Sequence, residues 1–398
     1  MNNNCTPQSR HIRFPPKTSQ PYDLVILGAG CAGLSLAYNL SNDPNYKGRV
    51  LLVDRKVEYG RDRSWCFFSP DDATLVPGSL ITHQWPIAIV RRGDESLRLS
   101  LGSKPYTLVD ASSFYQHCFE RLEDDSRFSI ALGHSISEED VLNESGEIAI
   151  RLDGQYYSTH QVVDSRTDKL IALSSAQLWQ VFIGYEIETD VPVFNSDEAT
   201  LMDFIEDQTH PVSFMYELPT SRTKALLEYT VFSSTCIAPE RLEPLLERII
   251  SDRLAGKAFR INRTEKGVIP MGLADQSRTI NHRWVKAGLI SGAARSSTGY
   301  AFLRIQRWAR ICSEKLRSQT VIGLPHKDPI LTSTMDRIFL KVLAIRPHHG
   351  PKLFFDLFKN TPTPSLIRFL NDEGRYLDHI LVILSLPKRP FIRRLFLK

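Results

Sequence analysis

The feature that most constrains the fold is a glycine-rich turn that joins a strand to a helix near the N-terminus. Residues 22–27 (YDLVIL) are apolar and include branched side chains, which is typical of a buried parallel strand. The turn GAGCAG (28–33) follows at once, and residues 34–40 (LSLAYNL) have helical periodicity. A second apolar run, 49–53, ends in Asp54. This order predicts a dinucleotide-binding βαβ unit of the Rossmann type.

Each part of the turn has a physical role in such a unit. Gly28 permits the tight turn, Gly30 lets the backbone approach a pyrophosphate, and Gly33 lets the helix pack closely on the strand. The backbone at Ala29 and the helix N-terminus offer amide groups and a positive dipole end to phosphate. Asp54 is expected to accept hydrogen bonds from an adenosine ribose with free hydroxyls. The alternative is a βαβ crossover that binds no ligand.

The segment after Asp54 favours FAD over NAD. Arg55 follows directly, and RDRSWCFF (61–68) places Arg61, Arg63 and three aromatic residues shortly afterwards. Arginine can bind phosphate, and aromatic side chains can line a flavin or an apolar substrate. The alternative is that these aromatic residues belong to the ordinary core.

Composition excludes several classes of protein. A net charge of +4 on 398 residues gives no case for nucleic acid binding. The six cysteines form no CxxC pair and no Cys/His cluster, so we expect no metal site and reduced thiols in a cytoplasmic protein. Residues 1–21 are polar and broken by proline, which predicts a loose tail without a secretory signal. No run reaches the ~20 apolar residues of a membrane span.

The remaining patterns predict an α/β fold in which an antiparallel sheet is inserted into the dinucleotide-binding domain. Residues 161–165 (QVVDS) form a strand that ends near Asp164, and 289–302 runs from a strand into small residues before a helix at 303–316. This second junction is expected to approach the cofactor, the alternative being a tight crossover. Alternating patterns in 178–234 predict several strands, and 240–254 is helical.

We therefore expect four regions. They are a tail at 1–21, a discontinuous FAD-binding domain at 22–175 and 265–325, a substrate domain at 176–264, and a helical region at 326–398. The last of these contains amphipathic pieces and ends in PKRPFIRRLFLK, which mixes basic and large apolar residues. Such mixtures suit the surface of an anionic bilayer, whereas the alternative is a helical cap with a solvated basic face.

The sequence resembles the flavin-dependent lycopene β-cyclases, in the bacterial subgroup that carries a DRxWCF segment. The resemblance covers about residues 22–395 and is carried by YDLVILGAGCAGLSLAYNL, DRSWCFF, VFIGYEIE, ATLMDF, FMYELP, ALLEYT, GAARSSTGYAF, PTPSLIRFL and LVILSLPKRP. It implies an intramolecular lyase or isomerase that cyclises the linear ends of lycopene to β-ionone rings. The family uses reduced FAD without net redox change, with NAD(P)H as the expected electron source. It also implies a peripheral place on the inner face of the cell membrane.

The resemblance also implies site residues. The essential acid of the family falls on Glu228 in LLEYT, a lone acid in an apolar strand whose pKa burial should raise. Many members carry two adjacent acids here, but this chain has Tyr229. Asp203 is the second catalytic candidate, followed by Glu186 or Glu188, and Arg295 is expected to contact phosphate. The implied flavin contacts are Gly28, Ala29, Gly30, Gly33, Asp54, Arg55, Arg63, Asp164, Gly292, Ala293 and Gly299.

Three other functions fit parts of the sequence. A flavin-dependent monooxygenase or halogenase would use the same fold, although SGAAR replaces the GD pair usual in hydroxylases and no halogenase lysine motif is evident. A cyclase of another terpenoid would share the same chemistry. A non-catalytic, membrane-peripheral flavin or lipid binder would not depend on Glu228.

Overall fold

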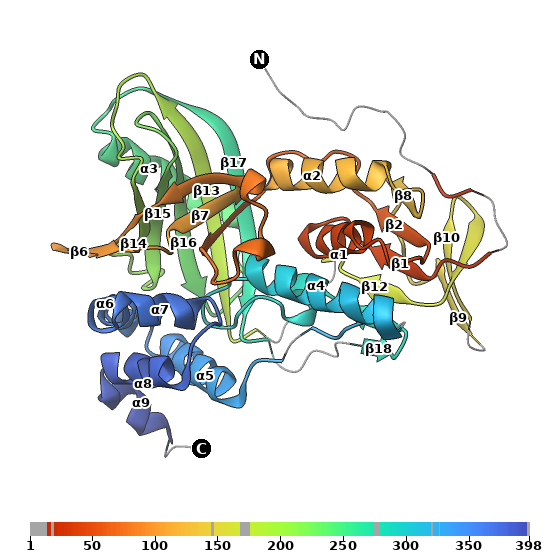
Figure 1. Ribbon diagram of the computed structural model, residues 1–398. Helices are drawn as coiled ribbons and strands as arrows, with labels where there is room; N and C mark the ends of the chain where they lie inside the picture. The colour runs from red at the N-terminus through yellow and green to blue at the C-terminus, as the bar shows by residue number, and fades with distance from the viewer. Residues whose placement is uncertain are drawn as a thin grey trace.

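The computed structural model describes residues 14–16, 20–144, 147–167, 176–273, 279–319, 321–325 and 327–395. Two large sheets lie side by side, and a group of C-terminal helices packs beneath one of them (Figure 1). Most of the tail expected at 1–21 falls outside the described residues.

The first large sheet is the predicted dinucleotide-binding sheet. Its strands are parallel from β19 to β8, and β18 adds an antiparallel edge. Their order is β18 (Thr279–Asn281), β19 (Trp284–Lys286), β12 (Val162–Asp164), β1 (Leu24–Leu27), β2 (Val50–Asp54) and β8 (Phe128–Leu132). The predicted strands at 22–27, 49–53 and 161–165 are confirmed as β1, β2 and β12.

Both faces of this sheet are covered, which explains its continuous apolar strands. Leu24 and Ile26 join a core with the helices, whereas Val25 and Leu27 face a small antiparallel sheet. The helices are α1 (Cys31–Asn42), α2 (Ala111–Glu123) and α4 (Phe302–Gln319). The small sheet is β9 (Val141–Glu144), β10 (Glu147–Leu152) and β11 (Gln155–Thr159).

The second large sheet has seven strands and is antiparallel except where β14 meets β5. Its order is β17 (Phe259–Met271), β13 (Leu178–Thr189), β16 (Lys224–Ser233), β15 (Ser213–Pro219), β14 (Glu198–Phe204), β5 (Ile87–Arg92) and β6 (Glu95–Ser100). The strands expected within 178–234 are confirmed. The sheet also takes β5 and β6 from inside the range predicted for the FAD-binding domain, because apolar Ala88 and Val90 complete its core.

A three-stranded sheet connects the two halves. It consists of β3 (Ser64–Phe68), β7 (Tyr106–Asp110) and β4 (Ile81–Trp85), in which β7 is the central strand. Phe67 and Val109 belong to the helix-covered core of the first sheet, whereas Phe68 and Tyr106 belong to the core of the second. The segment that contains the arginines and aromatic residues is therefore held at the boundary between the halves.

Helices cover both faces of the seven-stranded sheet. The predicted helix at 240–254 is confirmed as α3 (Glu243–Arg253), which packs on the face opposite the C-terminal helices (Figure 1). The C-terminal helices are α5 (Ile330–Ile345), α6 (Gly350–Asn360), α7 (Thr363–Leu370), α8 (Tyr376–Ser385) and α9 (Lys388–Leu395). Phe204 and Phe232 of the sheet contact Phe354 of α6, with ring centroids 6.1 and 5.7 Å apart.

Arg295 connects the loop before α4 to the C-terminal helices. Its guanidinium lies 3.2 Å from a carboxylate oxygen of Asp336, 3.5 Å from one of Asp372, and 4.1 Å from the ring centre of Phe369. The expectation that Arg295 contacts phosphate is therefore wrong, because its charge is already neutralised inside the protein. In the described part of the chain, no helix is long and apolar enough to cross a membrane.

Candidate active site

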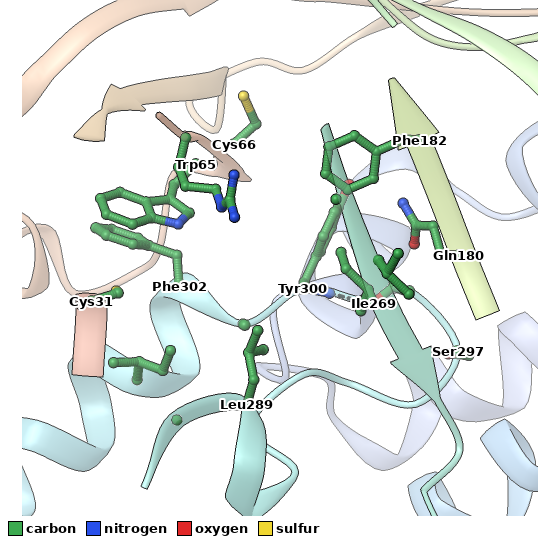
Figure 2. Close-up of a pocket in the computed structure, with 18 of the residues that line it drawn as sticks. Cys31, Trp65, Cys66, Gln180, Phe182, Ile269, Leu289, Ser297, Tyr300 and Phe302 are labelled. Atoms are coloured by element: carbon green, nitrogen blue, oxygen red, sulfur yellow. Dashed lines mark hydrogen bonds between the residues drawn. The ribbon is translucent and has the colours of Figure 1, made fainter. Parts of the chain in front are cut away.

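A cavity of about 900 Å³ runs from the GAGCAG turn to the C-terminal helices. Figure 2 shows its middle part, where Trp65 and Phe302 stand on one side and Phe182, Gln180 and Ile269 project from the seven-stranded sheet on the other. The cavity therefore has a polar end at the dinucleotide-binding sheet and an apolar end beneath the second sheet. Residues far apart in the sequence meet in it.

The glycine turn has the geometry that a pyrophosphate requires. Gly28 and Gly30 line the cavity, and Gly28 has a φ of +98°, which a residue with a side chain would rarely adopt. A Cβ on Gly30 would have no atom within 4 Å, so the backbone there is open to a ligand. Gly33 does not line the cavity. A Cβ there would lie 1.9 Å from the Gly28 oxygen, so this glycine allows the helix to pack on the turn.

Asp54 lies at the end of β2 and lines the cavity, as predicted. Its carboxylate accepts hydrogen bonds from the backbone N–H groups of Ala29 and Lys56. The hydrogen bond from the Ala29 N–H to Asp54 therefore connects the glycine turn to the end of β2. Arg55 and Arg63 also line the cavity.

Asp164 does not line the cavity. Its carboxylate is paired with Arg166 at 2.7 Å, and Arg166 and Ser165 line the cavity in its place. The sequence signal was present, because these residues follow directly on β12, where loops of a parallel sheet approach a ligand.

The second strand-to-helix junction, which was expected at 289–302, reaches the cavity at residues earlier in the chain than expected. The strand ends at Lys286 in β19, so Leu289 lies in a short 3₁₀ helix and not in a strand. Gly288 and Leu289 line the cavity, as does the predicted Gly299. Gly288 has a φ of +68°, and a Cβ there would lie 3.0 Å from that of Ala32 in α1, so this is the close approach of the junction.

Gly292 and Ala293 lie away from the cavity lining. Gly292 ends the 3₁₀ helix in the left-handed conformation, with a φ of +78°. Ala293 packs against the helix-covered core, and its carbonyl accepts a hydrogen bond from Arg304 at 3.3 Å. Both were predicted as flavin contacts, and the earlier strand end explains the displacement.

Three cross-strand rows of the seven-stranded sheet form the floor of the apolar part. The register aligns Tyr216, Glu228, Gly184 and Glu265 across β15, β16, β13 and β17. The next row contains Phe214, Thr230, Phe182 and Gly267, and the third contains Phe232, Gln180 and Ile269. All of these except Gly184 line the cavity.

Glu228 is the buried acid of this floor. It is 8% exposed, and one carboxyl oxygen accepts a hydrogen bond from the Thr230 hydroxyl at 2.9 Å. Burial, reinforced by the negative charge of Glu265, raises the pKa of Glu228 to about 8. A carboxyl group in this state keeps its proton at neutral pH and can donate it.

The neighbouring Tyr229 points to the opposite face of the sheet, because successive side chains of a strand alternate. It is fully buried in the core beneath α3, and its hydroxyl donates to a carboxylate oxygen of Asp207 at 2.9 Å. A carboxylate at position 229 would not share the cavity with Glu228 in this fold.

The other predicted acids do not reach the cavity. Asp203 pairs with Arg253 of α3 and lies 3.7 Å from a guanidinium nitrogen of Arg91. A bulge in β14 between Thr200 and Asp203 brings Leu201 and Met202 to the cavity lining and leaves Asp203 outside it.

Glu186 and Glu188 are likewise held in ion pairs outside the cavity lining. Glu186 pairs with Arg61 at 2.9 Å and Arg263 at 3.3 Å, and Glu188 pairs with Arg260 at 2.6 Å.

Two groups of cavity residues were not predicted. Glu265 lines the cavity and is 4% exposed. Tyr216, Tyr106 and Tyr300 form a hydrogen-bonded chain, with hydroxyl oxygens 2.8 and 3.3 Å apart. Burial raises the pKa of all three tyrosines, so they stay neutral. The cross-strand register brings Tyr216 and Glu265 into the same row as Glu228, and local sequence patterns do not contain these pairings.

The model of the lycopene cyclase protein family matches residues 23–396. The chain belongs to the lycopene cyclase family. It is 27% identical to a lycopene beta-cyclase of Pantoea ananas over 294 residues, which are 70% of this chain and 71% of the relative. It is 25% identical to a chloroplastic neoxanthin synthase of Solanum tuberosum, across 74% of this chain and 60% of that protein. The family assignment makes the chain an enzyme.

Solved structures share the fold at low sequence identity. A geranylgeranyl bacteriochlorophyll reductase-like protein from Thermoplasma acidophilum superimposes with a TM-score of 0.62, at 12% identity and with coverage of 94% of this chain and 98% of that one. The halogenase PltM in complex with phloroglucinol and FAD superimposes with a TM-score of 0.58, at 9% identity and with coverage of 92% and 85%. These similarities confirm the predicted Rossmann-type architecture with an added sheet and C-terminal helices.

Proposed function

We propose that this enzyme is a lycopene β-cyclase that closes β-ionone rings at the linear ends of lycopene. The observation that carries the proposal is a buried Glu228, whose pKa is raised by burial, in an apolar cavity that is continuous with the glycine-rich turn. The family match and the relative named lycopene beta-cyclase support the same reaction.

The dinucleotide end of the cavity suits FAD. Gly28 and Gly30 would hold the pyrophosphate, Asp54 the ribose, and Arg55 and Arg63 are cavity cations that can approach phosphate. The fold neighbour with bound FAD supports this choice of dinucleotide. A reduced flavin, with NAD(P)H as its electron source, would supply electron-rich character beside a developing cation.

The chain supplies the acid and the apolar surroundings. The Glu228 proton adds to the terminal alkene of the substrate and leaves a tertiary carbocation. The neighbouring double bond attacks that cation to close the ring, and loss of a ring proton restores neutrality. The Glu228 carboxylate left by the first step is a base within the same cavity. Phe182, Phe214 and Tyr216 line the cavity around Glu228, and aromatic faces stabilise cations while they exclude water.

Expression in bacteria that accumulate lycopene tests the proposal. We expect the wild-type chain to form γ- or β-carotene and Glu228→Gln to lose activity by about 10²- to 10⁴-fold, since a neutral amide cannot donate the proton. Asp203→Asn is the matched control, because it also neutralises a carboxylate of the sheet and should retain activity. Unchanged lycopene with a folded, FAD-containing wild-type protein would contradict the substrate assignment and favour another terpenoid or a redox reaction.

We also propose that the C-terminal helices place the enzyme on the inner face of the cell membrane. Ile330 of α5 and Tyr376, Leu377 and Leu384 of α8 are 87%, 73%, 63% and 62% exposed. The two helices adjoin, since the Thr332 hydroxyl lies 3.1 Å from a ring nitrogen of His379.

The cavity reaches the protein surface at these same helices. Leu331 and Ile383 line the cavity and are 38% and 43% exposed. An apolar substrate dissolved in a bilayer could therefore enter without crossing water.

A further inference from the structure

We propose that Glu265 is the second carboxylate of this active site, an ionised positioning residue that faces Glu228 across a gap left by Gly184. The proposal rests on the proposed role of Glu228 as the acid, and it goes beyond that role by giving Glu228 a partner from another strand. No second acid is needed at position 229, whose side chain lies on the opposite face.

The gap follows from the register of three strands. Gly184 of β13 pairs with Glu228 of β16 on one side and with Glu265 of β17 on the other. Residues paired in this way project from the same face, and strands lie about 4.8 Å apart, so the two α-carbons are roughly 10 Å apart. A side chain on Gly184 would stand between the two acids, since its Cβ would lie 2.9 Å from the Glu228 Cβ.

The surroundings of the two carboxyl groups are unequal. Glu265 accepts hydrogen bonds from the Ser64 N–H at 2.8 Å, the Ser64 hydroxyl at 2.7 Å and Arg263 at 2.9 Å. Three donors, one of them cationic, stabilise negative charge on the Glu265 carboxyl group. Glu228 accepts one neutral hydroxyl donor, from Thr230. Two carboxyl groups that share a dry site resist being ionised together, so this inequality assigns the proton to Glu228.

The charges around Glu265 leave a negative excess. Arg263 also binds Glu186, and Glu186 binds Arg61, which binds Asp110. Two guanidinium groups in this network face three carboxylates, so one negative charge is not compensated. Glu265 is the carboxylate of this network that lines the cavity together with Glu228.

Two other titratable groups near Glu228, among the residues that the structure describes, are neutral. Tyr216 of β15 pairs with Glu228 in the strand register. Cys66 of β3 is close enough for the charge of Glu228 to affect the pKa of the Cys66 thiol. Burial raises the pKa of both groups above the range in which they would ionise. Burial is the main reason why the pKa of Glu228 is raised, and Glu265 and Arg263, both on β17, are the charges that add to and oppose that shift.

Infrared titration of the full-length protein without substrate tests this proposal. The band of the protonated Glu228 carboxyl group is identified as the one that Glu228→Gln removes, and its midpoint is followed with pH. We expect the wild-type midpoint near pH 8. Glu265→Gln should lower it by about one pH unit, because a like charge is removed. Glu265→Asp, which keeps the charge, should restore most of the shift.

Two further variants separate charge from structure. Ser64→Ala removes one anchor of Glu265 but no charge, so its midpoint should stay close to that of the wild type. Arg263→Gln removes the cation and should raise the midpoint, which also tests the proposal if Glu265→Gln does not fold. An unchanged midpoint in Glu265→Gln, or a lowered one in Arg263→Gln, would overturn it. Since no carotenoid is used, these outcomes are independent of whether lycopene is the substrate.

Discussion

At the scale of single residues, the site depends on what surrounds each carboxyl group. Glu228, Asp203 and Glu186 all lie on strands of the seven-stranded sheet, but of these three only Glu228 lacks a cationic partner in direct contact. Burial without such a partner favours the protonated form, whereas an ion pair favours the carboxylate. The chemistry of each acid is therefore set by its neighbours more than by its position in the sequence.

The pKa of Glu228 predicts a pH-dependent stability. Between about pH 4.5, its ordinary value, and about pH 8, the folded state holds a proton that the unfolded state has lost. The free energy of unfolding should therefore fall as the pH rises through this window, by an amount on the order of a few kcal/mol. Glu228→Gln removes this contribution. Urea unfolding measured at pH 5 and at pH 8 gives the free energy of unfolding of both proteins. Relative to the wild type, the variant should be more stable at pH 8 than at pH 5, and a difference that is the same at both pH values would contradict the prediction.

The sequence predicted some of these residues and missed others for one reason. Gly28, Gly30 and Asp54 belong to a local motif, so their places follow from spacing alone. Glu265 contacts Ser64 from 201 positions away in the chain, and no local pattern contains that pairing. Asp203 was predicted from the family resemblance, but the bulge in β14 changes which residues face the cavity.

At the scale of secondary structure, the important feature of β13 is that Gly184 has no side chain between Glu228 and Glu265. Gly184→Ala would bring a Cβ to 3.1 Å from the Leu227 carbonyl oxygen as well as against Glu228. We expect a loss of about 1–3 kcal/mol in the free energy of unfolding, because β13 and β16 must separate, and a matching loss of cyclisation. Thermal unfolding and product analysis check this. The control is Gly78→Ala, where a Cβ would meet no atom within 4 Å; equal effects at both sites would refute the steric account.

The C-terminal helices depend on one buried cation. Arg295→Met would leave Asp336 without its guanidinium partner, at a cost of about 3–5 kcal/mol in the free energy of unfolding. Arg310→Met is the matched control, since the pair of Arg310 with Asp72 has side chains 39% and 44% exposed and should contribute at most about 1 kcal/mol. Denaturant unfolding of both variants measures the difference between their losses in the free energy of unfolding. Similar losses would show that burial of the pair is not what matters.

At the scale of the whole molecule, the apolar surface of α8 predicts binding to membranes. The double variant Leu377→Glu and Leu384→Glu should reduce sedimentation with anionic lipid vesicles by about tenfold or more, because two exposed leucines no longer enter the bilayer. The control is Val191→Glu. Val191 is 45% exposed and lies in the loop after β13, outside the C-terminal helices. If the double variant binds vesicles as the wild type does, the proposed surface is not the one in contact.

Most of the architecture could be predicted, because periodicity is a local signal. The βαβ unit, the strands within 178–234 and the C-terminal helices were all predicted, and the structure confirms them. The interleaving of the two halves could not be predicted, since the short β5–β6 hairpin pairs with β14 more than 100 residues later. Leu289 was assigned to a strand because its apolar neighbours resemble one, whereas β19 already ends at Lys286.

The alternation of β16 has a consequence for how natural variation in this family is interpreted. Residues 228 and 229 are adjacent in the chain, but one faces the cavity and the other faces the core beneath α3. Selection on the first concerns the proton transfer that we propose, and selection on the second concerns the packing of the sheet against α3. Two neighbouring columns of an alignment can therefore change at independent rates, and agreement at one says little about the other.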